Sequence, residues 1–201
     1  MRDATHPPRI LVLAGSARLD SIHRKLARQT VEALRHAGMG MEATLADLRD
    51  FPMPIYDGDL EAGEGIPPAA KALKELARRH DGFAIASPEY NGSFPALLKN
   101  ALDWISRPEA GERPLAVFRG KVAAILSASP SPGGGKRGLH QLRELLEMML
   151  VTVIPEQLAI ARSSGAFDAD GRLVRAEDLT GLQELAAALA PAAARNEEAA
   201  A

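Results

Sequence analysis

The first residues whose types and spacing could do chemistry lie in a short loop, from Gly15 to Ser21, between an apolar run and a helical pattern. Ser16 and Ser21 carry hydroxyls and Arg18 a guanidinium, and all three can donate hydrogen bonds. The N-terminus of the following helix adds unpaired N–H groups and the positive end of the helix dipole, which together suit a phosphate. The alternative is that Ser21 or Asp20 only caps the helix while Arg18 is a solvated charge.

A second polar loop, from Ser87 to Pro95, follows the third apolar run of the chain. Pro88 stiffens this turn, while Tyr90 and Asn91 add a flat apolar ring and an amide that both donates and accepts. These groups, together with exposed main-chain N–H groups, suit the edge of a heteroaromatic ring. The alternative is a plain loop in which Ser93 caps the helix that follows.

A third loop, from Ser127 to Gly138, has enough glycine for its backbone to approach a ligand closely. The alternative is that this loop binds no ligand and is only a mobile turn. It is not a Walker A motif, because Lys136 is followed by Arg137 rather than by Ser or Thr. The first loop lacks GxGxxG, and the five histidines show no metal-ligand spacing, so we expect no metal site. Glu89 is a single carboxylate without an evident partner. A phosphate cradle without a clear acid, base or nucleophile indicates that a bound cofactor supplies the chemistry.

The composition is that of a globular chain with no electrostatic preference for nucleic acid or for an anionic membrane. Of the 201 residues, 46% are hydrophobic and 25% are charged, and the formal net charge is -2. No apolar run approaches the roughly 18 residues of a membrane-spanning helix, and the residues up to Pro8 do not resemble a signal peptide. The lack of cysteine fits a reducing compartment. We therefore expect a soluble cytoplasmic protein with one domain over residues 1–190 and an Ala-rich, disordered tail over 191–201.

Short apolar runs alternate with longer helical patterns along the chain. The apolar runs predict strands near residues 10–14, 42–48, 83–86, 122–126 and 151–160. The helical patterns predict helices near residues 22–37, 69–80, 94–105, 139–149 and 178–190. Residues 51–68 and 107–120 are rich in Pro and Gly and are expected to be loops. Five strand–helix units in series predict a parallel α/β sheet with helices on both faces and a ligand site beyond the carboxyl ends of its strands.

Two of these loops carry a resemblance to a known family. The loop from Gly15 to Ser21, continued by Leu26 and Ala27, is similar to the GSxRxxSxNxxLA signature of the NAD(P)H-dependent FMN reductases. The loop from Ser87 to Pro95, continued by Leu98 to Trp104, resembles the second signature of this family, which includes quinone, azo-dye and chromate reductases. The resemblance extends from Arg9 to about Ala161. It implies a flavodoxin-like fold of three layers with a five-stranded parallel sheet in the order 2-1-3-4-5.

The resemblance also implies FMN-binding residues on all three loops. The residues at the phosphate would be Ser16, Arg18 and Ser21. The residues along the ribityl chain and the isoalloxazine ring would be Pro88, Glu89, Tyr90, Asn91 and Gly92, with Ser127, Ser129 and Gly133, Gly134 and Gly135 on the other side. His23 stands where the family usually has Asn, and its imidazole can also donate to the phosphate, most strongly when protonated.

The activity implied by the resemblance is the NAD(P)H-dependent reduction of bound FMN. A hydride would pass from C4 of NADH or NADPH to N5 of the flavin, which would then reduce a small-molecule acceptor, such as free flavin or a quinone, in ping-pong order. The alternative is an FMN-binding electron-transfer or redox-sensing protein with little nicotinamide turnover. A homodimer or homotetramer is expected from the family, and Trp104 suits either an interface or the core. The basic residues that could read a 2′-phosphate are Arg107, Arg113, Lys136 and Arg137.

Overall fold

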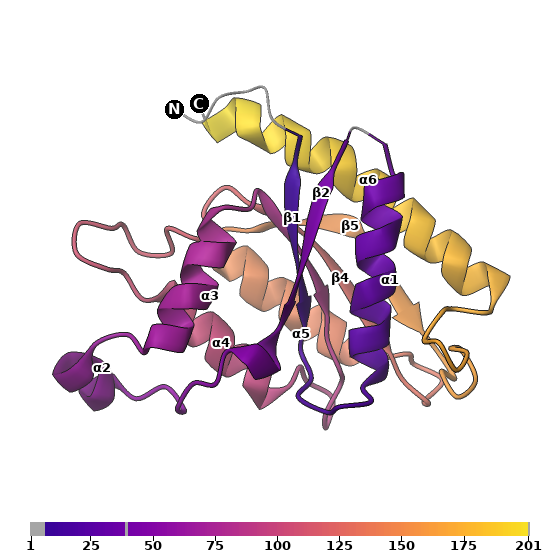
Figure 1. Cartoon of the computed structure of the whole chain (residues 1–201), viewed down its shortest axis with the longest axis horizontal. Coiled ribbons are helices and arrows are strands. Elements are labelled where there is room, and N and C mark those ends of the chain that lie inside the picture. The colour runs from indigo at the N-terminus through magenta and orange to yellow at the C-terminus, as the bar shows by residue number, and fades with distance from the viewer. Residues whose placement is uncertain (1–6, 39, 201) are drawn as a thin grey trace.

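Five parallel strands form one sheet in the order β2-β1-β3-β4-β5 (Figure 1). The computed structural model describes residues 7–38 and 40–200. The strands are β1 (Arg9–Ala14), β2 (Glu42–Asp47), β3 (Gly82–Ala86), β4 (Val122–Ala128) and β5 (Thr152–Ile160). The helices are α1 (Ile22–His36), α2 (Gly58–Glu64), α3 (Pro68–Arg78), α4 (Ala96–Ser106), α5 (Lys136–Met148) and α6 (Ala176–Ala200), with a 3₁₀ turn at Leu48–Asp50.

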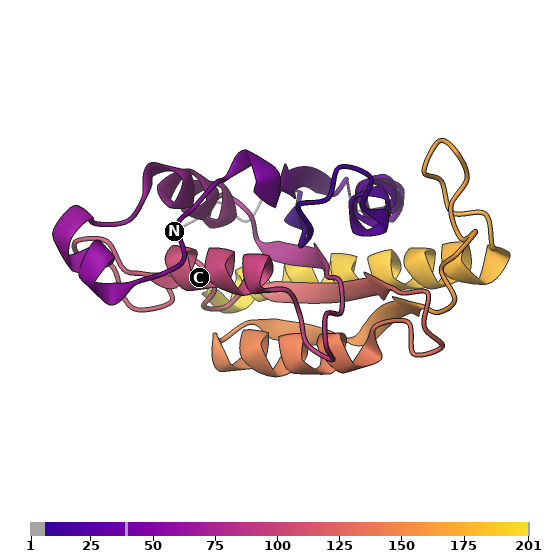
Figure 2. The same ribbon diagram turned by 90° about the horizontal axis from the view of Figure 1, so that it is seen from below.

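This architecture confirms the predicted α/β fold and the predicted strand order. The chain places β2 on one side of β1 and then crosses to the other side for β3, so the strand order reverses between β1 and β3. In such sheets the crevice at the carboxyl ends of the two strands is the usual ligand site. Helices α1 and α6 pack on one face of the sheet, and α3, α4 and α5 pack on the other. Figure 2 shows α5 beside β5 at one edge of the molecule.

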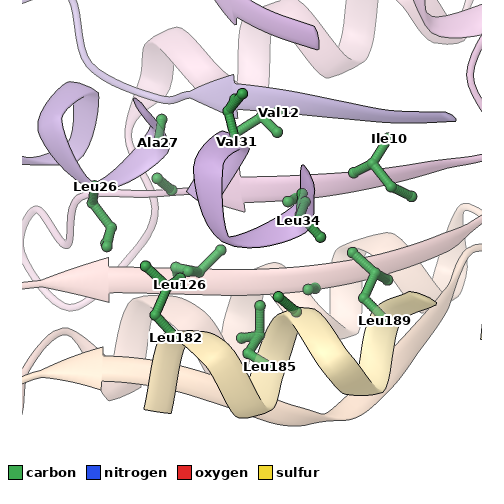
Figure 3. Packing of buried hydrophobic residues seen from close by; sticks show 14 of the residues in the cluster. Ile10, Val12, Leu26, Ala27, Val31, Leu34, Leu126, Leu182, Leu185 and Leu189 are labelled. Carbon is green, nitrogen blue, oxygen red and sulfur yellow. The ribbon is translucent and has the colours of Figure 1, made fainter. Parts of the chain in front are cut away.

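Alternate residues of β1 face the two helical layers. Ile10 and Val12 belong to the core beneath α1 and α6, whereas Leu11 and Leu13 belong to the core beneath α3, α4 and α5. Figure 3 shows the first core, in which leucines of α1 and α6 lie against the sheet: Leu26, Leu34, Leu182, Leu185 and Leu189. Burial on both faces explains why β1 is a continuous apolar run rather than an alternating one.

The structure differs from the sequence prediction at the last helix. The sequence predicts a helix that ends at Ala190 and a disordered tail, but the predicted end is wrong, because α6 continues through Pro191 to Ala200. Pro191 removes one helical N–H donor. Ala193, two residues further on, is fully buried in the core between α1 and α6, and alanine has the highest helix propensity. Tertiary packing and propensity together outweigh the proline.

A second difference lies in the stretch 51–68, which the sequence predicts to be a loop. The structure places α2 inside it, and the carboxylate of Asp57 caps this helix by accepting from the N–H groups of Asp59 and Leu60. The carbonyl of Pro54 accepts from Asn100 Nδ2 and Trp104 Nε1, both at 2.8 Å, so the stretch is anchored on α4.

Trp104 is fully buried, and its ring contacts Tyr56 edge to face at a centroid distance of 5.0 Å. The interface alternative for Trp104 is therefore wrong, and the core alternative is confirmed. None of the described helices has both the length and the apolar character needed to cross a bilayer. The expectation about an N-terminal signal peptide concerns residues 1–8, of which residues 1–6 lie outside the described part of the chain.

Candidate functional site

The loops after β1 and β3 begin side by side at the carboxyl edge of the sheet. The N–H of Gly15 donates to the carbonyl of Ala86 at 2.9 Å, so the first residue beyond β1 is tied to the last residue of β3. The N–H of Ser87 donates in turn to the carbonyl of Leu126 in β4 at 2.8 Å. The structure thus brings the three predicted loops to one edge of the sheet, next to the point where the strand order reverses.

The loop after β1 has the geometry of a helix N-terminus with spare donors. The Ser21 hydroxyl oxygen accepts from the N–H of His23 at 3.2 Å, so Ser21 is the N-cap of α1. The Ser16 hydroxyl oxygen accepts from the N–H of Arg18 at 3.4 Å. Both hydroxyls keep their own proton to donate, and the Arg18 guanidinium is exposed and makes no hydrogen bond or ion pair with any residue the structure describes. Capping by Ser21 and anion binding are therefore compatible in this loop.

Two ion pairs fix this loop from the sides. Asp20 pairs with Lys25 at 2.8 Å, and this contact lowers the pKa of the Asp20 carboxyl. Because the N-cap of α1 is Ser21, Asp20 does not cap the helix. Arg24 donates from Nη1 to the carbonyl of Leu19 at 2.7 Å and pairs through Nε with Asp47 at 2.6 Å. Arg24 therefore links α1, the loop and the end of β2. No spacing rule indicates this long-range contact.

The loop after β3 contains a tight turn. The N–H and C=O groups of Tyr90 and Ser93 bond to each other at 2.8 and 3.1 Å, and the two residues between them have positive φ, +53° at Asn91 and +80° at Gly92. Positive φ at both central positions is the geometry of a type I′ turn, which Asn-Gly favours. Tyr90 remains 50% exposed at this tip, and the Asn91 amide makes no hydrogen bond with any described residue.

Ser93 does not cap the following helix. Its hydroxyl donates to Gln141 Oε1 at 2.6 Å, and Gln141 Nε2 donates to the carbonyl of Gly92 at 3.0 Å. The N-cap of α4 is Pro95, which has no side-chain cap. The capping alternative for Ser93 is therefore wrong, and the loop after β3 is instead attached to α5. Glu89 is attached to α5 as well, because its carboxylate accepts from the N–H of Gly138 at 3.0 Å.

The loop after β4 combines an unpaired hydroxyl with two glycines, Gly134 and Gly135, at which a side chain would clash with neighbouring residues. Ser127 is fully buried, and its Oγ is the only buried side-chain nitrogen or oxygen without a hydrogen-bond partner among the described residues. Gly135 has a φ of +91°, and a Cβ there would overlap the Ser127 hydroxyl. Gly134 has a φ of +62°, and its Cβ would lie 2.7 Å from the carbonyl of Ala159. Ser129 accepts from the N–H of Ser131 at 3.2 Å, which turns the start of the loop.

His23 is placed differently from the sequence expectation. Its side chain is buried, and Nε2 accepts from the N–H of Ala128 at 3.2 Å. Burial lowers the pKa of the imidazole from 6.5 to about 4, so the ring is neutral at pH 7. The resemblance implies an imidazole that can donate to the phosphate. In this arrangement Nε2 is an acceptor bonded to the main chain, so the ring does not donate through this nitrogen.

The four basic candidates for a 2′-phosphate fall into two groups. Lys136 and Arg137 begin α5 at the carboxyl edge of the sheet and are exposed. Arg107 follows the far end of α4 and pairs with Glu61 at 2.9 Å, and Arg113 lies in the same connection. Since α4 starts at the carboxyl edge and runs away from it, only Lys136 and Arg137 lie on the side of the candidate site.

The chemistry of this edge is that of a binding site rather than of acid–base catalysis. It offers hydroxyl, guanidinium and main-chain donors around the N-terminus of α1, an amide on a rigid turn, and a buried hydroxyl beside a glycine backbone. Among the residues that the structure describes, no three His, Cys, Asp or Glu side chains come together in a possible metal site. The fold and the site together define a flavodoxin-like α/β protein with a ligand site built from three strand-end loops.

Comparison with known proteins identifies the family. The model of the family described as NADPH-dependent FMN reductase matches residues 8–165. An NAD(P)H-dependent FMN reductase of Pseudomonas aeruginosa is 39% identical over 167 residues, 83% of this chain and 84% of that protein. An NADPH:quinone oxidoreductase of Arabidopsis thaliana is 34% identical over 168 residues, 83% of this chain and 82% of that protein. The chain belongs to the NADPH-dependent FMN reductase family.

A solved structure of similar fold comes from the same functional class. FerB, described as a flavoenzyme NAD(P)H:(acceptor) oxidoreductase from Paracoccus denitrificans, matches with a TM-score of 0.77 and 26% identity, and the match covers 94% of this chain and 98% of FerB. The residues of the candidate site fit an FMN cofactor. The buried Ser127 hydroxyl has no partner among the described residues, which a ligand can supply, and the absent Cβ of Gly135 leaves space beside this hydroxyl.

Proposed function

We propose that the chain is an FMN-dependent NAD(P)H oxidoreductase that passes reducing equivalents to a small-molecule acceptor such as free flavin or a quinone. The observation that carries this proposal is the unpaired, fully buried hydroxyl of Ser127 at the carboxyl end of β4. A buried hydroxyl without a partner costs free energy, so a ligand that bonds to it is favoured. The family membership supports FMN as that ligand.

The phosphate of FMN is assigned to the loop after β1. Ser16 and Ser21 supply hydroxyl protons, Arg18 supplies a charge-assisted donor, and the first turn of α1 supplies its dipole. His23 makes no contact with the phosphate in this assignment, because its main-chain N–H donates to the Ser21 hydroxyl oxygen and its ring accepts from the Ala128 N–H. The shape of this loop is held by Arg24, which donates to the carbonyl of Leu19, and by Lys25, which pairs with Asp20.

The ring of FMN is assigned to the loops after β3 and β4. The lining residues on one side are Pro88, Glu89, Tyr90, Asn91 and Gly92, and those on the other are Ser127, Ser129, Gly133 and Gly134. The main chain of the first group is held by the turn at Asn91 and by the two attachments to α5. The side chain of Glu89 is used in the attachment, so its contribution to FMN comes from the main chain. A rigid lining of this kind orients the ring without rearrangement on binding.

When bound, FMN supplies the redox chemistry by accepting a hydride from the nicotinamide and returning reducing equivalents to the acceptor. The residues of the chain bind and orient the cofactor, and no side chain is assigned a proton transfer. The nicotinamide and the acceptor use the same space in turn, so a ping-pong order is part of the proposal. Lys136 and Arg137 are the residues proposed to contact a 2′-phosphate, which makes NADPH the favoured reductant.

The proposal includes a homodimer or homotetramer in the cytoplasm. Large apolar side chains are exposed on the loops after β1, β2 and β3, with Leu19 at 76%, Ile55 at 75% and Tyr90 at 50%. Exposed apolar side chains of this size favour contact with a second copy of the chain. Sedimentation at micromolar protein tests this part of the proposal, and a monomer alone would contradict it.

The test of the proposed function is a visible absorption spectrum after FMN addition and desalting, followed by anaerobic addition of NADPH. Retained flavin bands that bleach with NADPH support the oxidoreductase. Retained bands that do not bleach favour the electron-transfer or redox-sensing alternative. If no flavin is retained and a binding titration with FMN also shows no affinity, the proposed function is wrong. Parallel double-reciprocal plots with NADPH and a quinone support the ping-pong order, whereas intersecting lines contradict it.

A further inference from the structure

The carboxyl end of β4 has one N–H group for which the sheet offers no partner. The ladder between β3 and β4 ends at the pair Ala86 and Leu126, and the next bond, from Ser87 N–H to Leu126 C=O, is its last. The chain then turns away at Pro88. Because alternate residues of a strand direct their N–H groups to the same neighbour, Ala128 presents its N–H on this side, beyond the end of β3.

The imidazole of His23 supplies the hydrogen-bond acceptor that β3, which ends earlier, does not provide. Its Nε2 accepts from Ala128 N–H at 3.2 Å, across 105 residues of sequence. The side chain is buried, and the main-chain N–H of the same residue donates to the Ser21 hydroxyl oxygen at 3.2 Å. His23 is therefore bonded at one end to the cap of α1 and at the other to the last residue of β4.

We infer that His23 is a positioning residue for FMN, which holds the loop after β4 at a fixed separation from the N-terminus of α1. The inference rests on the proposed function, because it requires one ligand that spans both loops. Ser21 caps α1 two residues before His23, and Ser127 immediately precedes Ala128, so the bond sets the separation between these two hydroxyls. His23 acts through the main chain of Ala128 and does not itself touch the cofactor.

The protonation state of the ring is consistent with this role. Nε2 accepts a hydrogen bond only in the neutral form with the proton on Nδ1. Burial lowers the pKa of His23 to about 4, so the neutral form dominates at pH 7. Protonation would place two N–H groups opposite each other and remove the bond.

Two substitutions separate the hydrogen bond from the volume of the side chain. In His23→Gln the amide oxygen reaches the position of Nε2 and accepts without titrating, whereas in His23→Leu an apolar group leaves the Ala128 N–H unpaired. We expect the dissociation constant for FMN, from flavin fluorescence at pH 7.5, to rise about 10-fold or more in His23→Leu and to stay within about threefold in His23→Gln. Thr30→Val is the control, because Thr30 is a buried residue of α1 bonded only to Leu26 within its own helix. It removes a buried hydroxyl without a change in FMN affinity.

A second measurement on the wild-type chain does not depend on the folding of a variant. Imidazole ¹⁵N shifts at pH 7.5 are expected to show a protonated Nδ1 and an unprotonated Nε2, and the Ala128 amide to be protected from exchange without FMN. Equal FMN affinity of the wild type and His23→Leu would overturn the inference and leave the proposed function intact, as would the opposite tautomer. A wild-type chain without FMN affinity would instead overturn the proposed function and, with it, the role of His23 toward the cofactor.

Discussion

A carboxylate oxygen of Glu89 accepts a hydrogen bond from the N–H of Gly138 at 3.0 Å, across 49 residues of sequence. Helix α5 begins at Lys136 and has Gly135 in a left-handed conformation as its N-cap, with no side-chain cap of its own. The carboxylate of Glu89 therefore satisfies one of the open N–H groups of α5 from another loop, and its charge lies at the positive end of the helix dipole. The loop after β3 and the helix after β4 are held together by this contact.

Removal of the Glu89 carboxylate should lower the stability of the fold. Glu89→Ala deletes a charge-assisted bond to a helix N-terminus, so we expect the free energy of unfolding to fall by about 1–2 kcal/mol. Glu89→Gln keeps an acceptor and should lose less. The measurement is urea denaturation of the chain without FMN, with Glu156→Ala as a control for an exposed carboxylate on β5. An unchanged midpoint in Glu89→Ala would show that the contact contributes nothing to stability.

The glycines of the loop after β4 should respond very differently to the same substitution. In Gly135→Ala the new Cβ overlaps the Ser127 hydroxyl at a φ of +91°, so we expect a loss of about 2 kcal/mol or more together with weaker FMN binding. In Gly133→Ala the nearest protein atom is Ser131 Oγ at 3.8 Å, so the fold should tolerate the substitution. Thermal unfolding of both variants checks this contrast in stability, and an FMN titration of Gly135→Ala checks the loss of binding. Equal thermal stability of the two variants would contradict the loop geometry.

Most of the fold could be predicted from the sequence because its signals are local. The strand at 10–14 is an uninterrupted apolar run, and a strand buried on both faces needs no other pattern. The positive φ at Asn91 and Gly92 likewise follows from residue types that tolerate it. The end of the last helix could not be predicted, because Pro191 is a strong local stop signal and the burial of Ala193 depends on α1, far away in the sequence.

The site could be located but not described from the sequence. The three loops were predicted correctly as neighbours, since carboxyl ends of parallel strands meet at one edge. The partners of their side chains are long-range: Ser93 bonds to Gln141, Arg24 to Asp47, and His23 to Ala128. No spacing in one sequence indicates which of many polar residues will meet across such separations. The assignment of individual residues to FMN therefore stays a prediction that binding measurements test.

Arg18 provides the most direct of these binding measurements. Its guanidinium is exposed beside the N-terminus of α1 and makes no bond to another described residue, so its removal should leave the fold unchanged. A charge-assisted bond to phosphate contributes about 1.5–3 kcal/mol, so Arg18→Ala should weaken FMN binding about 10- to 100-fold. Riboflavin, which lacks the phosphate, should bind both proteins alike. Arg28→Ala, on the exposed face of α1, is the matched control for net charge. Equal FMN affinity in Arg18→Ala would remove the phosphate from this loop.

The buried imidazole of His23 should make the stability of the chain depend on pH. Its pKa is about 4 in the folded chain, whereas a solvated histidine of the unfolded chain has a pKa of 6.5. At pH values between these two, the unfolded chain therefore binds more protons than the folded chain. Stability then rises with pH through this window, is fully present above about pH 6.5, and is lost as the pH falls toward 4. Burial also lowers the pKa of His80, so His80 acts in the same direction. His80 is present both in the wild type and in His23→Gln, so its effect cancels in the comparison. From pH 7 to pH 5 we therefore expect the wild type to lose about 2 kcal/mol more than His23→Gln in urea denaturation. Parallel losses in the two proteins would mean that His23 is solvated in the folded chain, and that its ring does not hold the end of β4.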